Sequence, residues 1–292
     1  MSIVTFKKFG WKYTGQTEWA LKDINLEISE NEFVCITGPN ESGKTTLALA
    51  ISGLVPHNYL GTMEGDLYVL GYNVKNIKPF QLSGKIGFVY SDPEAQFITM
   101  SVEEELAIGL ENRAYSIDEI RENIKWALDI VGISEDYLEK PPYELSGGQK
   151  QRVALAAVLA TKPNVLILDE PTSMLDPIGK EEIINAILQL NKKYKTTIIL
   201  IEHRLDEVAH LANRFILLYK GRIIMDSPPS HFFENVDFLI EKGVRVPEHL
   251  QLFASLKKIN LYNSALPLQK DHATKILRDM WGVLNGKADH SE

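Results

Sequence analysis

The most informative segment of this 292-residue chain reads Gly38-Pro39-Asn40-Glu41-Ser42-Gly43-Lys44-Thr45-Thr46. The apolar run at 33–37 predicts a buried strand before this segment, and the apolar run at 47–51 predicts a helix after it. A loop between two such elements lets backbone N–H groups and the positive helix end converge on a phosphate. The spacing Gly-x-x-x-x-Gly-Lys-Thr therefore predicts a nucleotide-binding loop in an α/β protein.

Side chains of this loop have separate predicted roles. Lys44 can reach the β- and γ-phosphates, and Thr45 carries a hydroxyl suited to Mg²⁺. We expect Glu41 to point to solvent, because phosphates would repel its carboxylate. The residues expected to surround the nucleotide here are Gly38, Pro39, Asn40, Glu41, Ser42, Gly43, Lys44, Thr45 and Thr46.

Composition bounds the remaining possibilities. The net charge of -8 and pI of about 5.5 argue against a surface built to hold nucleic acid, so no nucleic-acid partner is expected. The single cysteine, Cys35, excludes an internal disulfide and favours a reducing compartment. No apolar run approaches the ~18 residues that span a bilayer, so we expect a soluble chain that reaches a membrane only through a partner.

Acidic residues and a histidine follow two further apolar strands. The run at 165–168 is followed by Asp169 and Glu170, and the run at 196–201 by Glu202 and His203. Carboxyl ends of neighbouring parallel strands meet at one sheet edge, where open α/β sheets place their chemistry. Asp169 could hold Mg²⁺, Glu170 could polarise a nucleophile, and His203 could bond a γ-phosphate. The alternative for Asp169 and Glu170 is a surface turn with two solvated acids.

Helix signals fill residues from about 95 to 160. Ser101 with Glu104 and Ser116 with Glu119 have the spacing of capping boxes. Ser146 is placed to cap a following helix, which creates a second helix N-terminus able to hold an anion. Asp176 before Pro177 predicts the start of another helix.

Together these motifs resemble the ATP-binding cassette (ABC) ATPases, over residues 2–230. The Walker A loop is 38–45, the signature is 145–149, Walker B is 165–169 followed by Glu170, the D-loop is 173–176, and His203 matches the switch histidine. The resemblance implies an α/β fold of the P-loop NTPase ABC type. It implies a mostly parallel RecA-like core sheet, an N-terminal antiparallel β subdomain and a helical subdomain. It divides the chain into an ABC ATPase domain at 1–230 and a small C-terminal helical appendage at 231–292.

The same resemblance implies how the site works. Two subunits meet head to tail, and each ATP lies between the Walker A loop of one and the signature of the other. Glu170 orients water, Lys44 neutralises charge, His203 holds the γ-phosphate, and Thr45 with Asp169 holds Mg²⁺. Tyr13 matches the aromatic residue that stacks on adenine. The residues that would contact ATP across the seam are Ser146, Gly147, Gly148, Gln149 and Asp176.

Two positions depart from the ABC pattern. Glu41 replaces the more usual glycine at a free position of the Walker A loop. After 88–90 the family usually has a glutamine that touches Mg²⁺ and relays closure to the membrane partner, but this chain has Ser91. Gln96 follows five residues later. It could substitute only if the loop folds back.

A narrower resemblance is to ATPases of energy-coupling factor transporters, including the cobalt and nickel branch. It rests on 92–97, 101–112, 243–248 and 266–268. It implies ATP-driven uptake of a vitamin or metal ion at the cytoplasmic face of the cell membrane, with a transmembrane coupling subunit and a separate substrate-capturing membrane protein. The acidic run Glu103–Glu105 lies close to the groove where the coupling helix would insert, and is either a contact for that helix or a solvated face.

Two alternatives belong to other classes. A soluble ABC ATPase acting on ribosomes or DNA would carry long coiled coils or two fused cassettes, and neither is visible. A GTP switch protein would have no use for the signature, and 191–194 lacks the guanine-reading aspartate. The residues do not determine the cargo, or whether the second ATPase subunit is an identical copy or a paralogue.

Overall fold

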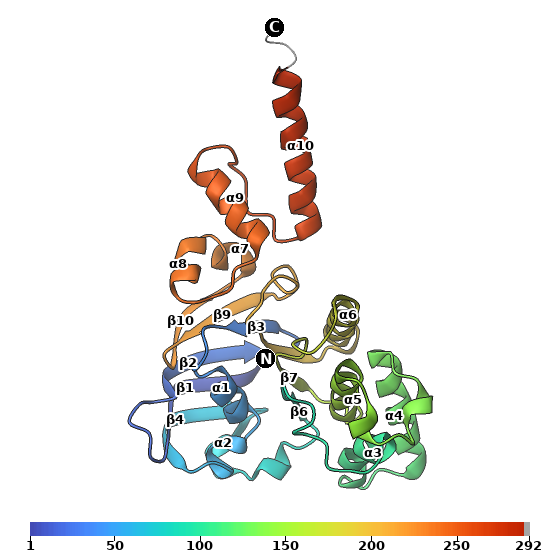
Figure 1. Cartoon of the computed structure of the whole chain (residues 1–292). Helices are drawn as coiled ribbons and strands as arrows, with labels where there is room; N and C mark the ends of the chain where they lie inside the picture. Colours follow the sequence, from blue (N-terminus) through green and yellow to red (C-terminus); the bar gives the residue numbers. More distant parts are fainter. Residues whose placement is uncertain (289–292) are drawn as a thin grey trace.

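The computed structural model describes residues 1–288, with the side chains of residues 1–281. Two β-sheets lie side by side, helices α3 to α6 flank them, and α7 to α10 extend beyond β9 and β10 (Figure 1). The larger sheet has six strands in the order β10-β9-β3-β8-β7-β6. These strands are β10 (Arg222–Ser227), β9 (Arg214–Tyr219), β3 (Phe33–Thr37), β8 (Thr197–Ile201), β7 (Val165–Asp169) and β6 (Ile86–Val89).

The central strands of this sheet are parallel and buried along their whole length. β3, β7 and β8 are buried at every residue, as expected for continuous apolar runs covered on both faces. β9 continues the parallel set beside β3, and only β10 runs antiparallel, joined to β9 through Lys220 and Gly221. The expected mostly parallel core sheet is confirmed.

The smaller sheet is antiparallel and covers the first part of the chain. Its order is β2-β1-β4-β5, formed by β2 (Leu21–Ser29), β1 (Ser2–Tyr13), β4 (Gly61–Val69) and β5 (Tyr72–Asn73). Its inner face packs with α1 (Lys44–Ile51) and the core sheet in one apolar cluster that includes Trp11 and Leu47. α2 (Leu54–His57) follows α1. The expected N-terminal antiparallel sheet is therefore present.

Helices α3 (Val102–Glu111), α4 (Ile117–Val131) and α5 (Gly147–Leu159) occupy the region where helices were expected, and α6 (Pro177–Tyr194) follows β7. The capping box of Ser116 and Glu119 is confirmed. For the capping box predicted at Ser101, one of the two expected hydrogen bonds is present and the other is not. Ser101 accepts from Glu104 N, but the Glu104 carboxylate accepts from Met100 N, one residue beyond the position of a box. Single-turn 3-10 helices link other elements at Val74–Asn76, Pro79–Gln81, Glu135–Tyr137 and Pro142–Glu144.

The C-terminal appendage begins by sharing the core of the cassette. It contains the second half of α7 (Pro229–Phe232), then α8 (Val236–Glu241), α9 (Glu248–Lys258) and α10 (Lys270–Ala288). Buried side chains up to Leu250 join the same apolar cluster as β3 and β8, whereas α10 projects away from the body (Figure 1). Among the described residues, no helix has the length and apolar character that crossing a membrane requires.

Candidate functional site

Two glycines fix the shape of the phosphate loop. Gly38 has φ +149°, and a β-carbon there would lie 2.0 Å from the carbonyl oxygen of Leu218. Gly43, the N-cap of α1, has φ +105°, and its β-carbon would lie 2.4 Å from the carbonyl oxygen of Ala20. The backbone at these two glycines therefore lies too close to neighbouring carbonyl oxygens for a side chain to fit. This packing leaves the N-terminus of α1 available to a phosphate.

Lys44 lies across the loop that it follows. Its Nζ donates to the carbonyl oxygens of Gly38 at 3.1 Å and Pro39 at 2.9 Å. Burial lowers the pKa of Lys44, while Glu170 and Asp169 raise it. Lys44 is thus held over the loop with its charge facing two carboxylates.

Glu41 is exposed and has φ +61°, which confirms that it points to solvent and shows why glycine suits this position. The half-buried Tyr13 lies beside the first turn of α1, where its hydroxyl is 3.2 Å from Thr46 Oγ1. Its ring meets those of Trp11 and Tyr59 edge to face. Stacking of Tyr13 on adenine stays a prediction.

The two expected magnesium ligands are in contact. Thr45 Oγ1 donates to Asp169 Oδ2 at 3.0 Å, which joins the start of α1 to the end of β7. Burial raises the pKa of Asp169, and the Thr45 hydrogen bond opposes that shift. A hydroxyl and one carboxylate fit Mg²⁺, which takes few protein oxygens and completes its shell with phosphates and water.

Glu170 and His203 also meet. β7 and β8 are paired in register, so the residues after them emerge together, and His203 Nε2 lies 3.1 Å from Glu170 Oε1. Burial, then Lys44 and Arg245, lower the pKa of His203. The lowered pKa favours the neutral imidazole, whose Nε2 lies beside the Glu170 carboxylate. The alternative of two solvated acids fails because Asp169 is only 6% exposed.

Sequence reasoning assigned no role to Glu202. Its carboxylate is buried and accepts a hydrogen bond from Thr172 Oγ1 at 3.1 Å. Burial raises its pKa to about 7, with Glu170 and Glu207 acting in the same direction and Thr172 opposing them. Its place directly after a wholly buried strand was the available signal.

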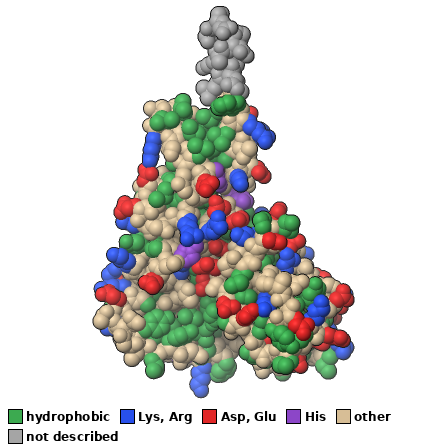
Figure 2. Space-filling model, in the orientation of Figure 1, with side chains coloured by type: hydrophobic (Ala, Val, Ile, Leu, Met, Phe, Trp, Pro, Cys, Tyr) green, Lys and Arg blue, Asp and Glu red, His purple; other side chains and the backbone are tan. Residues whose placement is uncertain are grey.

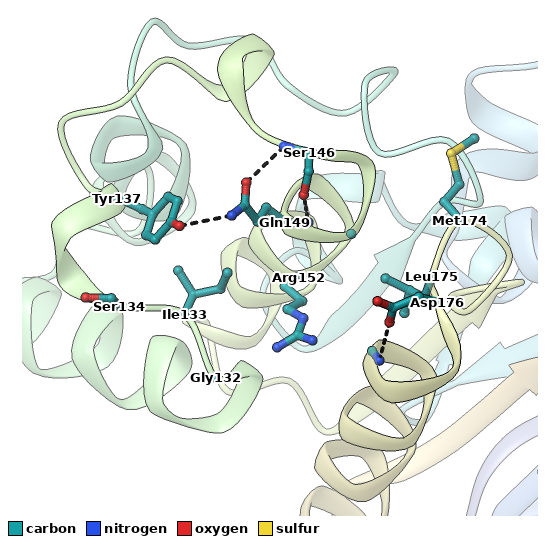
Figure 3. A pocket seen from close by; sticks show the side chains of 12 residues that line it. Gly132, Ile133, Ser134, Tyr137, Ser146, Gln149, Arg152, Met174, Leu175 and Asp176 are labelled. Carbon is teal, nitrogen blue, oxygen red and sulfur yellow. Dashed lines mark hydrogen bonds between the residues drawn. The ribbon is translucent and has the colours of Figure 1, made fainter.

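The signature segment forms the start of α5 as expected. Ser146 Oγ accepts from Gln149 N at 3.3 Å, and Gln149 Oε1 accepts from Ser146 N at 2.9 Å. Gln149 Nε2 also donates to the Tyr137 hydroxyl at 3.0 Å (Figure 3). Asp176 caps α6 by accepting from Gly179 N at 2.6 Å on the opposite side of the same hollow (Figure 3). Gly147 and Gly148 belong to the first turn of α5.

The signature hollow and the catalytic hollow are separate. The signature hollow is lined by Ser146, Gln149, Arg152 and Asp176 among others. The catalytic hollow, lined by residues such as Glu170 and His203, shares none of the lining residues of the first. The catalytic residues and the signature residues, which should together enclose ATP, therefore face different hollows of one chain.

The comparisons with known proteins agree with this geometry. The family described as ABC transporter matches residues 21–173. The chain belongs to the ABC transporter family. It is 42% identical to the energy-coupling factor transporter ATP-binding protein EcfA2 of Clostridium tetani over 82% of each chain. Among solved structures, cbiO1 of Clostridium perfringens, part of the ABC transporter complex cbiONQ, is 32% identical with a TM-score of 0.72. That match covers 86% of this chain and 98% of cbiO1.

A third relative bears on assembly. The ATP-binding cassette MJ0796, solved as a dimer in a post-hydrolysis state with ADP and Pi, is 29% identical with a TM-score of 0.69. The match covers 77% of this chain and 98% of that one.

Within this ABC cassette, the loop after β6 folds back. Gln96 Oε1 accepts from Tyr90 N at 2.6 Å, so the condition for Gln96 to approach the end of β6 is met. That bond uses the side-chain oxygen of Gln96, and Ser91 is half-buried nearby. Which of the two takes the family role of the glutamine stays open.

The acidic run on α3 is not a uniform solvated face. Glu105 is 7% exposed and accepts from Ile98 N, Thr99 N and Thr99 Oγ1 at 2.9 to 3.1 Å. Its carboxylate ties down the preceding loop. Only Glu103 and Glu104 remain exposed for a partner.

Proposed function

We propose that this chain is the ATP-hydrolysing subunit of an ABC importer of the energy-coupling factor type. Its relationship to EcfA2 and cbiO1 supports the transporter class. The observation that carries the catalytic part is the contact of Glu170 with His203, beside the Thr45–Asp169 contact at the phosphate loop. A base, a neutral imidazole, a metal-type oxygen pair and a loop lysine meet at one sheet edge, as phosphoryl transfer requires.

The residues of this site divide the tasks of the proposed reaction. Lys44 and the amides at the start of α1 hold the terminal phosphates, and Thr45 with Asp169 would hold Mg²⁺, which neutralises developing negative charge. Glu170 accepts a hydrogen bond from the attacking water and aligns it with the γ-phosphorus. His203 orients Glu170 and donates toward the γ-phosphate once nucleotide fills the hollow.

The second half of each site comes from another subunit. Ser146 and Glu170 face different hollows of one chain. The ATP site is therefore complete only when the signature helix of a second ABC subunit covers the bound nucleotide. The partner is a copy of this chain or a close paralogue. Binding of ATP closes the pair, and hydrolysis with phosphate release opens it.

A separate apolar groove is suited to the transmembrane coupling subunit. It is lined by side chains such as Leu54, Leu82 and Phe88, and Phe80 at its edge is 72% exposed. A coupling helix inserted there would move with the neighbouring loop after β6 when the two ABC subunits close. The chain would then lie at the cytoplasmic face of the cell membrane, with a separate capture protein selecting a vitamin or metal ion.

Replacing Glu170 tests the catalytic assignment. Glu170→Gln should lower the rate of ATP hydrolysis on the order of 10²-fold or more and leave ATP binding intact, because the amide cannot accept a proton from water. Glu122→Gln, an exposed acid on α4, is the matched control and should hydrolyse ATP at the wild-type rate. Wild-type turnover in Glu170→Gln would remove Glu170 from catalysis.

Native co-purification tests the transport assignment. A membrane subunit should accompany the chain from native membranes, and reconstitution with it should raise ATPase activity and drive uptake. Recovery of ribosomes or DNA ends instead would favour a soluble ABC ATPase.

A further inference from the structure

The appendage sends one segment, 243–247, into contact with the nucleotide site. A β-carbon at Gly243 would lie 3.2 Å from Cβ of Pro39 in the phosphate loop, so these two backbones are neighbours. Arg245 pairs as a parallel β-bridge with Arg204, the residue after His203. The segment is thus attached both to the phosphate loop and to the end of β8.

Burial on either side of Arg245 fixes the direction of its side chain. Val244 and Val246 are 5% and 4% exposed and belong to the same apolar core as Leu205 and Val208. Arg245, between these two buried valines, has an exposed side chain and so points away from this core. There it is exposed and lines the catalytic hollow with Asn40, Glu170 and His203.

The charges in this hollow leave Arg245 available for a ligand. Among the described residues, Arg245 makes no ion pair within 4.0 Å, while Glu170 is engaged by His203 and Glu202 by Thr172. The hollow measures about 340 Å³, ample for a phosphate group. Figure 2 shows basic, acidic and histidine side chains gathered at mid-height of the molecule. A guanidinium has a planar set of donors that matches phosphate oxygens and keeps its charge at any physiological pH.

We propose that Arg245 binds the terminal phosphate of ATP, and after cleavage the inorganic phosphate, in the catalytic hollow of its own chain. The proposal rests on the proposed ATPase function. It makes the appendage part of the nucleotide site, because displacement of 243–247 would withdraw one cation from the γ-phosphate. Arg245 distinguishes ATP from ADP, since ADP has no phosphate at that position.

Nucleotide affinities of the full chain test the assignment. Arg245→Ala should weaken ATP binding about tenfold or more, the usual size for a charge-assisted hydrogen bond, and leave ADP affinity unchanged. It should raise by a similar factor the orthovanadate concentration that half-inhibits hydrolysis, because vanadate with ADP occupies the place of the γ-phosphate. Arg245→Lys, which keeps the charge, should recover most of both losses.

Lys257→Ala removes an exposed cation from α9 of the same appendage and should behave as wild type. Equal losses of ATP and ADP affinity in Arg245→Ala would mean a structural role, and no loss would mean no contact with phosphate. Either result overturns the proposal. Because Val244 and Val246 anchor the segment without the guanidinium, Arg245→Ala should fold, and its thermal unfolding verifies this. If the ATPase assignment itself were wrong, the wild-type chain would not hydrolyse ATP, whatever Arg245 does.

Discussion

The two halves of the nucleotide site, the Walker half and the signature half, differ in burial and in charge. The Walker half gathers Lys44, Asp169 and Glu202, each less than a tenth exposed, at the carboxyl ends of buried parallel strands. The signature half is the exposed N-terminus of α5, where Ser146 and Gln149 satisfy each other. The Walker half therefore carries perturbed charges that the fold must hold in place, and the signature half is a helix start whose capping groups satisfy each other.

This difference predicts a division of labour. Charges held at the Walker half should be sufficient to bind nucleotide within one chain. The signature half contributes backbone amides, the Ser146 hydroxyl and the helix dipole, which become useful when a phosphate is brought to them. Variants in the two halves should therefore fail at different steps.

Lys44→Ala should have the largest effect, because it removes the cation nearest the phosphates. We expect ATP affinity of the isolated chain to fall on the order of 10²-fold, measured by equilibrium binding. Lys125→Ala, an exposed cation on α4, is the control and should bind as wild type. Unimpaired binding by Lys44→Ala would show that the Walker half does not depend on this charge.

Ser146→Asp should separate binding from hydrolysis. Aspartate still caps α5, but its carboxylate would face the phosphate of the opposite subunit. ATP binding by the single chain should be unchanged, while hydrolysis falls on the order of 10-fold to 10²-fold. Ser116→Asp makes the same change at the cap of α4, away from the seam, and should hydrolyse normally. A loss of binding in Ser146→Asp would contradict the division between the halves.

Glu202→Gln should give the smallest effect, on stability. The folded pKa of about 7 lies above the ordinary 4.5, so the unfolded chain loses this proton first as pH rises. The free energy of unfolding therefore falls between about pH 4.5 and pH 7 and then levels off. Glutamine keeps an acceptor for Thr172 without the charge. We expect a gain of up to about 3 kcal/mol at pH 8 and almost none at pH 4.5.

Thermal unfolding of Glu202→Gln at both pH values measures this gain, which should appear as a rise of a few degrees at pH 8 only. Glu64→Gln, exposed on β4, should show no such pH dependence. An unchanged pH profile in Glu202→Gln would mean that another group causes the loss of stability.

Much of the Walker half could be predicted because its chemistry follows local patterns. The loop around Lys44, the acids after β7 and His203 each follow an apolar strand, and parallel strands bring their ends together. The caps at Ser116, Ser146 and Asp176 were predictable because a cap uses neighbours within three residues.

Contacts between distant segments could not be predicted in this way. Glu105 looked like part of a solvated acidic run, but it is buried because the loop before α3 turns back over it. Arg245 lies in a tail pattern that gives no hint of a neighbour some 40 residues earlier, and only the fold of α8 returns it to His203. Glu202 was visible, but its pKa depends on burial and on Glu170.

Mixing the two disabled variants tests the shared site most directly. A pair made of one Lys44→Ala chain and one Ser146→Asp chain contains one site with both defects and one site with neither. We predict that the mixture hydrolyses ATP well above the sum of the two variants measured alone, and more so as equal amounts are approached. A mixture that never exceeds that sum would contradict a nucleotide site built from two copies of this chain.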